Sequence, residues 1–262
     1  MSEDESQWAP TAFDGPDPEL RAVVGVPSDV PDAPDAPEAP DAPDAPVPGW
    51  LAGLVGRLDT IAPEALSRLL PPEEGGRASA VLILFGPGPG YAAGAGDLGD
   101  VDVLLTQRSA DLRSHSGQVA FPGGATDPED DGPVAAALRE AREEVGLDPA
   151  GVQVLGSLPN LYLPPSGYVV TPVLAWWRRP GPVGPVDHRE VARVVRVPLR
   201  ELLDAANRFN VRHPSGYVGP GFAARDLFVW GFTAGLLSRV LWLAGLEKPW
   251  DEKRFEPLPD LS

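Results

Sequence analysis

The sequence predicts a mixed α/β sandwich, and three observations support this fold class. Short apolar runs that suit strands lie both before and after one long helix-like segment rich in glutamate. A second helix-like segment, almost entirely apolar, follows near the C-terminus. Strands on both sides of one helix, with another helix at the end, are typical of a layered α/β domain.

The N-terminal segment differs in composition from the rest of the chain. Residues 1–50 contain twelve carboxylates against a single basic residue, Arg21, in a chain of 262 residues with a net charge of −17. Asp32–Pro46 consists of tandem Asp/Glu-Ala-Pro triplets, which favour polyproline II and cannot build a core. We therefore expect residues 1–49 to be an acidic, disordered extension, with a binding motif as the alternative, residues 50–250 to form one domain, and residues 251–262 to be a tail.

The first part of the domain reads as short helices followed by strands. Trp50–Leu70 has apolar residues at helix-like intervals broken at Pro63, which predicts one or two short helices. Ala78–Phe85 and Val101–Thr106 are short apolar runs that predict buried strands. Further strands are predicted at Val152–Leu158, Tyr168–Trp176, Val191–Val197, Arg208–Arg212 and Tyr217–Gly219, with a helix at Leu199–Ala206.

The long glutamate-rich helix is predicted over Val134–Val145. Its residues are mostly Ala, Leu, Glu and Arg, which are strong helix formers. Pro133 suits the first turn, and Gly146 suits the left-handed position just past the end. We therefore expect a helix bounded at both ends by local signals.

The segment Leu227–Leu246 is nearly apolar over the length of a membrane span. Arg239 stands in its middle, and a charge at the centre of a span costs at least about 2.5 kcal/mol. We therefore predict a buried helix that packs Trp230, Leu237 and Leu241 on the sheet. Four tryptophans are expected in the core or at a subunit interface, with stacking on adenine as the alternative: Trp176, Trp177, Trp230 and Trp242. A homodimer stays open.

Three glutamates share one face of the long helix. Glu140, Glu143 and Glu144 stand at i, i+3 and i+4, so their carboxylates repel one another. A solvated face partly neutralised by Arg139 and Arg142 is one interpretation. The other is a hard divalent cation such as Mg²⁺, which prefers oxygen ligands.

A glycine-bearing loop and two arginines precede that helix. The paired glycines of Phe121–Gly124 allow close approach of backbone to a ligand or metal. Arg108 and Arg113 follow the Val101–Thr106 strand, and guanidinium groups recognise phosphate with a planar fork of donors. Each arginine alone could equally be a surface charge.

These residues together resemble a known family. From Gly124 the chain resembles the Nudix box, G-x5-E-x7-R-E-U-x-E-E-x-G-U with U aliphatic, and its second half, Arg139–Leu147, follows it closely. Upstream, Leu104–Gly124 matches LLTxRSxxxRxxxGxxxFPGG without a gap, the pattern of the coenzyme A pyrophosphatase branch of Nudix hydrolases. Weaker resemblance downstream, including Glu190–Val191, extends the match to roughly residues 76–246.

The chain departs from the box in two places. One extra residue separates Gly124 from Arg139, so the glutamate expected in the first half falls on or near Asp130 or Asp131. We expect Asp131 to cap the helix instead. The aliphatic position after Glu140 is only an alanine.

The resemblance implies a Nudix-type α/β/α sandwich with a mixed sheet and a metal-dependent diphosphatase. It implies that Glu140, Glu143, Glu144 and the backbone carbonyl of Gly123 hold Mg²⁺ or Mn²⁺. Arg139 would orient a glutamate through a salt bridge. The implied substrate is coenzyme A or a thioester of it, cut to 3′,5′-ADP and 4′-phosphopantetheine or its acyl form.

The substrate-binding residues implied by the upstream motif are Arg108, Arg113, His115, Gly117 and Phe121. His115 could donate to a phosphate or fix its own loop. Nudix enzymes take their general base from a helix glutamate or from a later loop, and Glu140 is the one we name.

Two other functions stay open: a Nudix hydrolase of NADH, ADP-ribose or a nucleoside triphosphate, and a Nudix-fold module that binds a nucleotide without catalysis. The intact helix glutamates speak against the second. The acidic charge opposes nucleic-acid binding. The absence of cysteine and of a signal peptide at the acidic N-terminus leads us to expect a cytoplasmic protein whose partner is a small molecule, not a membrane.

Overall fold

A computed structural model describes most of the chain from Asp44 onward. The described ranges are 44–67, 70–72, 75–91, 100–110, 117–164, 166–214 and 216–259. Most of the predicted acidic extension, together with Arg113 and His115, lies outside these residues.

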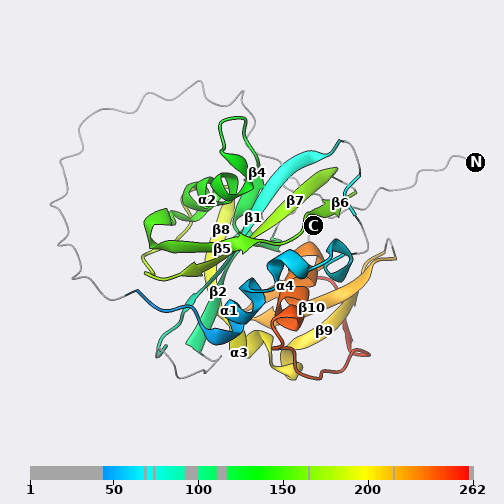
Figure 1. Ribbon diagram of the computed structural model, residues 1–262. Coiled ribbons are helices and arrows are strands. Elements are labelled where there is room, and N and C mark those ends of the chain that lie inside the picture. The colour runs from blue at the N-terminus through cyan, green and yellow to red at the C-terminus, as the bar shows by residue number, and fades with distance from the viewer. Residues whose placement is uncertain are drawn as a thin grey trace, which may run out of the picture.

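The described residues form two sheets and four α-helices (Figure 1). The larger sheet contains β1 (Arg77–Pro87), β2 (Val101–Arg108), β3 (Val119–Ala120), β4 (Gly123–Ala125), β5 (Val152–Ser157), β6 (Leu161–Leu163), β7 (Tyr168–Trp177) and β8 (Val191–Pro198). The smaller sheet contains β9 (Arg208–Arg212), β10 (Val218–Ala224), β11 (Leu227–Val229) and β12 (Phe255–Glu256). The helices are α1 (Gly49–Val55), α2 (Gly132–Val145), α3 (Leu199–Leu202) and α4 (Gly231–Leu243), and short 3-10 turns cover Leu58–Thr60, Pro63–Ala65, Pro149–Gly151 and Ala205–Asn207.

The larger sheet is mixed, as predicted. Its central strands β1 and β7 are parallel, in a register that runs from Arg77 opposite Tyr168 to Phe85 opposite Trp176. The other pairs in this sheet are antiparallel: β2 pairs with β1, β3 and β8, β4 pairs with β1, and β5 and β6 pair with β7. Strand β8 pairs with β2 alone among the described strands, so it forms an edge of the sheet.

Strand β1 buries both of its faces, which explains its continuous apolar sequence. Ala80, Leu82 and Leu84 pack on one side with the apolar face of α2. Val81 and Ile83 pack on the other side with α1, α3 and α4. Helices thus cover both faces, with α2 opposite α4 (Figure 1), and the predicted α/β/α sandwich is confirmed.

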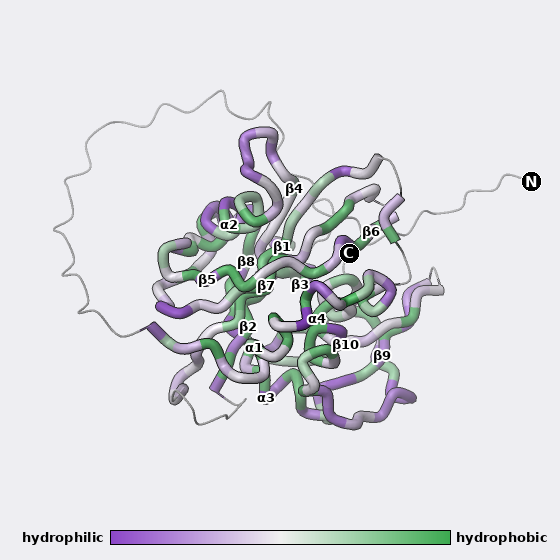
Figure 2. The backbone as a smooth tube through the Cα atoms, viewed as in Figure 1, coloured by the Kyte–Doolittle hydropathy of each residue, from purple (hydrophilic) through white to green (hydrophobic). Residues whose placement is uncertain are grey.

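The local signals at the two ends of α2 act as predicted. Pro133 stands in the first turn, and Gly146 takes the left-handed conformation, φ 68°, in which its N–H donates to the Arg142 carbonyl. The helix buries Ala136, Ala137 and Ala141 against the sheet. Because these side chains are small, the helix backbone lies close to the strands and its glutamates can reach them. Figure 2 shows the resulting contrast between apolar central strands and hydrophilic residues along α2 and the outer loops.

The smaller sheet was not predicted as a separate unit, and it corrects one element boundary. The C-terminal helix was expected from Leu227, but residues 227–229 form β11 and α4 begins at Gly231. Arg225 and Asp226 both have positive φ, 52° and 60°, and make a two-residue hairpin between β10 and β11. Positive φ at both central residues characterises a type I′ turn, usually built with Asn or Gly, so this hairpin lacked its usual sequence signal. The helix expected over Leu199–Ala206 is likewise shorter, because α3 ends at Leu202.

The ordered domain extends beyond both expected boundaries. The Trp176 indole Nε1–H donates to the Ala45 carbonyl at 2.7 Å, and the Tyr91 hydroxyl donates to the Pro46 carbonyl at 2.9 Å. At the other end, Phe255–Glu256 of the expected tail pairs with β9 as β12. Residues 45–46 and 255–256 therefore contact the domain expected over residues 50–250.

The apolar C-terminal segment is a core helix. Leu237 and Leu241 are fully buried, and Trp230 precedes the helix with only 7% of its surface exposed. Trp176 and Trp177 are also buried, whereas Trp242 is 51% exposed. Within the described ranges, no helix is long and apolar enough to cross a membrane.

Candidate active site

The carboxylate face of α2 lies against β4, the short strand formed by the paired glycines. A Cβ atom on Gly124 would lie 2.5 Å from the Glu140 carboxyl carbon, so any side chain there would displace that carboxylate. Gly123 has φ 155°, and a Cβ atom on it would collide with the backbone of Ala80. The two glycines are therefore what allows the glutamates to approach the backbone this closely.

Glu144 is held directly by this strand. The Gly123 N–H donates to Glu144 Oε2 at 3.1 Å. Leu82 donates to the Pro122 carbonyl and Thr126 to the Ala78 carbonyl, so β4 bonds to β1 through alternate residues. Gly123 falls between these residues, and its N–H and C=O both point away from β1. Its carbonyl therefore opens to the same side as Glu144.

Burial makes the Glu144 carboxyl an unusually weak acid. It raises the pKa of this carboxyl to about 8, against an opposing effect of the Gly123 N–H, which favours the ionised form. The negative charge of Glu140 raises it further, the positive charge of Arg108 lowers it, and Glu190 adds a smaller increase. A carboxylate with so little local compensation is a natural ligand for a cation.

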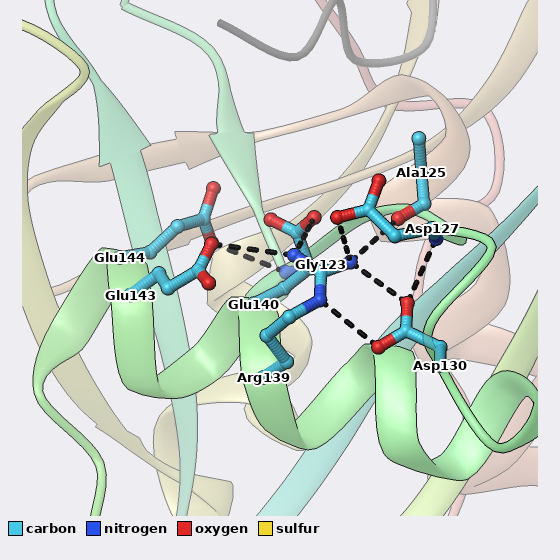
Figure 3. A network of polar contacts seen from close by, with 8 residues as sticks. All are labelled: Gly123, Ala125, Asp127, Asp130, Arg139, Glu140, Glu143 and Glu144. Carbon is cyan, nitrogen blue, oxygen red and sulfur yellow. Dashed lines mark hydrogen bonds and ion pairs between the residues drawn. The ribbon is translucent and has the colours of Figure 1, made fainter.

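Arg139 links the other carboxylates of the site (Figure 3). Its Nε and Nη2 donate to the two oxygens of Asp130 at 3.0 and 2.9 Å, a bidentate pair. Its Nη1 donates to Glu140 at 2.9 Å and to Glu143 at 3.2 Å, and Nη2 also donates to the Ala125 carbonyl at 2.9 Å. One guanidinium therefore connects the start of α2, the end of β4 and two helix glutamates.

Asp130 takes the place of the glutamate expected in the first half of the motif. Its side chain is only 6% exposed, and its bonds from Arg139 hold the pKa of its carboxyl below the usual range. The extra residue in the loop is thus accommodated with a shorter acidic side chain. Asp131 stands at the N-cap position, as expected, but its side chain makes no capping hydrogen bond within the described structure.

Glu140 lies between the buried Glu144 carboxyl and the Arg139 guanidinium. Burial raises the pKa of its carboxyl, while the hydrogen bond and the charge of Arg139 lower it. Glu143 differs, because its side chain is 60% exposed and turns toward Arg139. Glu140 and Glu144 are therefore partly buried, and Glu143 is exposed.

The donor set fits a hard divalent cation. Glu140 and Glu144 flank the glycine strand, and the Gly123 carbonyl opens to the same side, so all of the available ligands are oxygens. Within the described part of the chain no three acidic or histidine side chains already converge on one point. Glu143 would join the other two by rotating away from Arg139, which its exposure allows.

The upstream motif contributes differently from what was expected. Arg108, at the end of β2, acts electrostatically on Glu144, and Gly117 has φ 68° and accepts a hydrogen bond from the Gln107 side chain. Phe121 is 1% exposed and packs in the core on the face of the sheet opposite α2. Its side chain therefore packs in the core, and its contact with substrate stays a prediction.

Glu190 lies near the site, and no role was predicted for it from the sequence. It immediately precedes β8, its backbone carbonyl accepts from the Ser109 N–H at 2.9 Å, and its charge acts on Glu144. The contact brings the end of β2 and the start of β8 together beside α2. In the sequence Glu190 is only an acidic residue directly before an apolar strand. Many surface turns have such a residue, so this pattern does not identify a site residue.

Comparison with known proteins agrees with this geometry. A model of the NUDIX domain matches residues 90–215. The chain is 42% identical over 156 residues to a Nudix hydrolase named NudL from Citrobacter koseri, with 55% of this chain and 76% of that protein covered. It is 40% identical over 157 residues to NudL from Escherichia coli K12, with the same coverage.

A solved structure with a similar arrangement is the Nudix hydrolase RenU from M. smegmatis. The TM-score is 0.46 at 22% identity, covering 68% of this chain and 92% of that one. The assignment to a family depends on the match to the NUDIX model and on the similarity to NudL, because this chain covers 76% of the NudL sequence. The chain therefore belongs to the Nudix hydrolase family, enzymes that hydrolyse derivatives of nucleoside diphosphates.

Proposed function

We propose that this Nudix hydrolase cleaves the diphosphate of coenzyme A or its thioesters, giving 3′,5′-ADP and 4′-phosphopantetheine or its acyl form. The observation that carries the proposal is the ungapped motif Leu104–Gly124 and its place in the fold. Strand β2 ends with Arg108 within electrostatic reach of Glu144, and the same motif ends with the Gly123 N–H bonded to that carboxylate. The substrate motif and the metal-binding motif thus meet at one side chain.

In this proposal Glu140, Glu143 and Glu144, with the Gly123 carbonyl, hold Mg²⁺ or Mn²⁺. When bound, such an ion neutralises diphosphate oxygens and lowers the pKa of a water molecule. Arg139 acts by position, because its bonds to Asp130 and Glu140 set where the Glu140 carboxylate lies. Arg108 supplies a guanidinium for the diphosphate, and Arg113 and His115 belong to the same motif.

A base must take the proton of the attacking water, and two carboxylates of the site are candidates. Glu140 is partly buried, and burial raises the pKa of its carboxyl, which makes it a better proton acceptor than an exposed glutamate. Glu190 lies on a loop outside the helix, beside Glu144. Substituting each by glutamine and comparing the pH profiles of kcat would separate them, since loss of the base removes the acidic limb of the profile.

The test of the proposal is product analysis on a panel of diphosphates. With Mg²⁺ or Mn²⁺ the enzyme should release 3′,5′-ADP from coenzyme A faster than it cleaves NADH, ADP-ribose or a nucleoside triphosphate, and EDTA should abolish all turnover. Equal or faster cleavage of ADP-ribose or NADH would replace the proposal with the second candidate, a hydrolase of another nucleoside diphosphate derivative. The cytoplasmic location and a homodimer stay predictions.

A further inference from the structure

A second group of charged side chains lies along β8, and most of them are basic. A groove of about 610 Å³ follows the edge strand β8, and we call it the β8 groove. The lining residues that matter here are Asp102, His188, Ala192, Arg193, Arg196 and Arg225. Three arginines thus face one carboxylate, in a chain whose net charge is −17. A basic groove on so acidic a protein attracts anions.

The three arginines differ in how far their charges are already compensated. Arg196 Nε lies 3.4 Å from Asp102 Oδ2, and Arg225 Nε lies 3.0 Å from Glu201 Oε1. Arg193, within the described residues, donates only to the Arg225 backbone carbonyl, at 3.4 Å. Its side chain is exposed, so its guanidinium can turn toward a ligand without breaking an ion pair.

The β8 groove lies next to the C-terminal end of α2, because Pro185 lines the groove and the Val186 N–H donates to the Glu144 backbone carbonyl at 3.1 Å. Glu190 acts on Glu144, while its neighbours His188 and Ala192 line the groove. Because β8 pairs with β2 alone among the described strands, the backbone N–H groups on its outer edge also face this side. A ligand held at the α2 carboxylates can therefore extend past residue 190 into a basic groove.

We propose that the β8 groove binds a second phosphate of the substrate, a phosphomonoester on its nucleoside half, while the diphosphate lies at the α2 carboxylates. The size of the groove is within the range of sites for nucleotide-sized ligands. A dianionic phosphomonoester matches its excess of guanidinium groups, which bind phosphate through parallel N–H donors. This deepens the proposed function, because coenzyme A carries such a group at its 3′ position.

The test compares nucleotides that differ only in that phosphate. Calorimetric titration of the metal-free protein with 3′,5′-ADP and with 5′-AMP should show about tenfold tighter binding of 3′,5′-ADP. Arg193→Ala should abolish this preference. Arg239→Ala is the matched control, because Arg239 is also exposed but lies on α4, outside the groove lining, and the preference should survive. Equal affinities in the unsubstituted protein, no measurable binding of either nucleotide, or a preference unchanged by Arg193→Ala would overturn the proposal.

A kinetic comparison separates this proposal from the proposed function. The ratio of kcat/KM for coenzyme A to that for 3′-dephospho-coenzyme A should fall about tenfold in Arg193→Ala, mainly through KM. If coenzyme A is not cleaved but the binding preference holds, the proposed function fails and the groove assignment stands. If coenzyme A is cleaved but Arg193→Ala leaves the ratio of the two kcat/KM values unchanged, the groove assignment fails and the proposed function stands.

Discussion

The two ends of the carboxylate face of α2 differ in how their negative charges are compensated. Toward the N-terminus Arg139 pairs with Asp130, Glu140 and Glu143, so the acidic side chains there share a fixed cation. Toward the C-terminus Glu144 accepts only the Gly123 N–H among the hydrogen bonds of the site, and burial raises its pKa to about 8. Arg139 therefore acts as a clamp at one end, and in the proposed function the other end binds a metal cation.

The sharpest test of this contrast is Glu144→Gln. Glutamine can still accept the Gly123 hydrogen bond but cannot provide a negative charge, so the fold should be kept while hydrolysis falls at least about 100-fold, the scale seen when a charge-stabilising group is removed. Steady-state kinetics with Mg²⁺ and a circular dichroism spectrum would measure both. Glu129→Gln is the matched control, because Glu129 is exposed in the loop before α2 and should lose nothing. Full activity in Glu144→Gln would refute the metal-binding assignment.

At the N-terminal end of α2, where Arg139 pairs with Asp130, we expect a substitution to reduce stability as well as activity. Arg139→Ala leaves the Asp130 carboxylate, 6% exposed, without its bidentate partner. Removing one member of a buried ion pair costs 3–5 kcal/mol, and because Arg139 is itself 25% exposed we expect about 2 kcal/mol, or roughly 5 °C in Tm. Thermal unfolding measured by calorimetry would check this.

A double substitution distinguishes a clamp from a simple surface pair. Adding Asp130→Asn to Arg139→Ala removes the unpaired charge, so the double variant should be more stable than the sum of the two single losses predicts. Additive losses would mean that Arg139 and Asp130 act independently. The N-terminal end of α2 would then not be a clamp that stabilises the fold.

Much of this helix could be predicted from the sequence because its determinants are local. Pro133 and Gly146 act within one turn of the chain, and the i, i+3, i+4 spacing of the glutamates fixes their common face without reference to the rest of the fold. The burial of both faces of β1 was likewise visible as an uninterrupted apolar run.

The features that sequence reasoning missed depend on contacts between distant segments. Whether Asp130 or Asp131 meets Arg139 depends on how the loop absorbs one extra residue, which no local pattern encodes. Glu190 joins the site only because β8 pairs with β2. Strand β12 is two residues long and exists only through β9, so a segment of ordinary polar composition gave no sign of it.

The raised pKa of Glu144 makes the last prediction, a pH dependence of stability in the metal-free protein. In the unfolded chain this carboxyl titrates near its ordinary value of 4.5, and in the folded protein near 8. Between these values the folded state binds more protons than the unfolded state, so stability should fall as the pH rises, by at most about 1.4 kcal/mol per pH unit. Asp130, whose pKa is lowered, has the opposite sign but acts only in more acidic solution.

Calorimetry in EDTA across this range would show the decline, and the difference between the unsubstituted protein and Glu144→Gln would isolate it. That difference is needed because burial lowers the pKa of His213, which makes stability rise with pH near neutrality and partly hides the effect. Mg²⁺ should reverse the decline, since a cation binds the ionised carboxylate and pulls its pKa down. An identical pH dependence with and without Glu144 would mean that this end of α2 is compensated after all, and that the two ends do not differ.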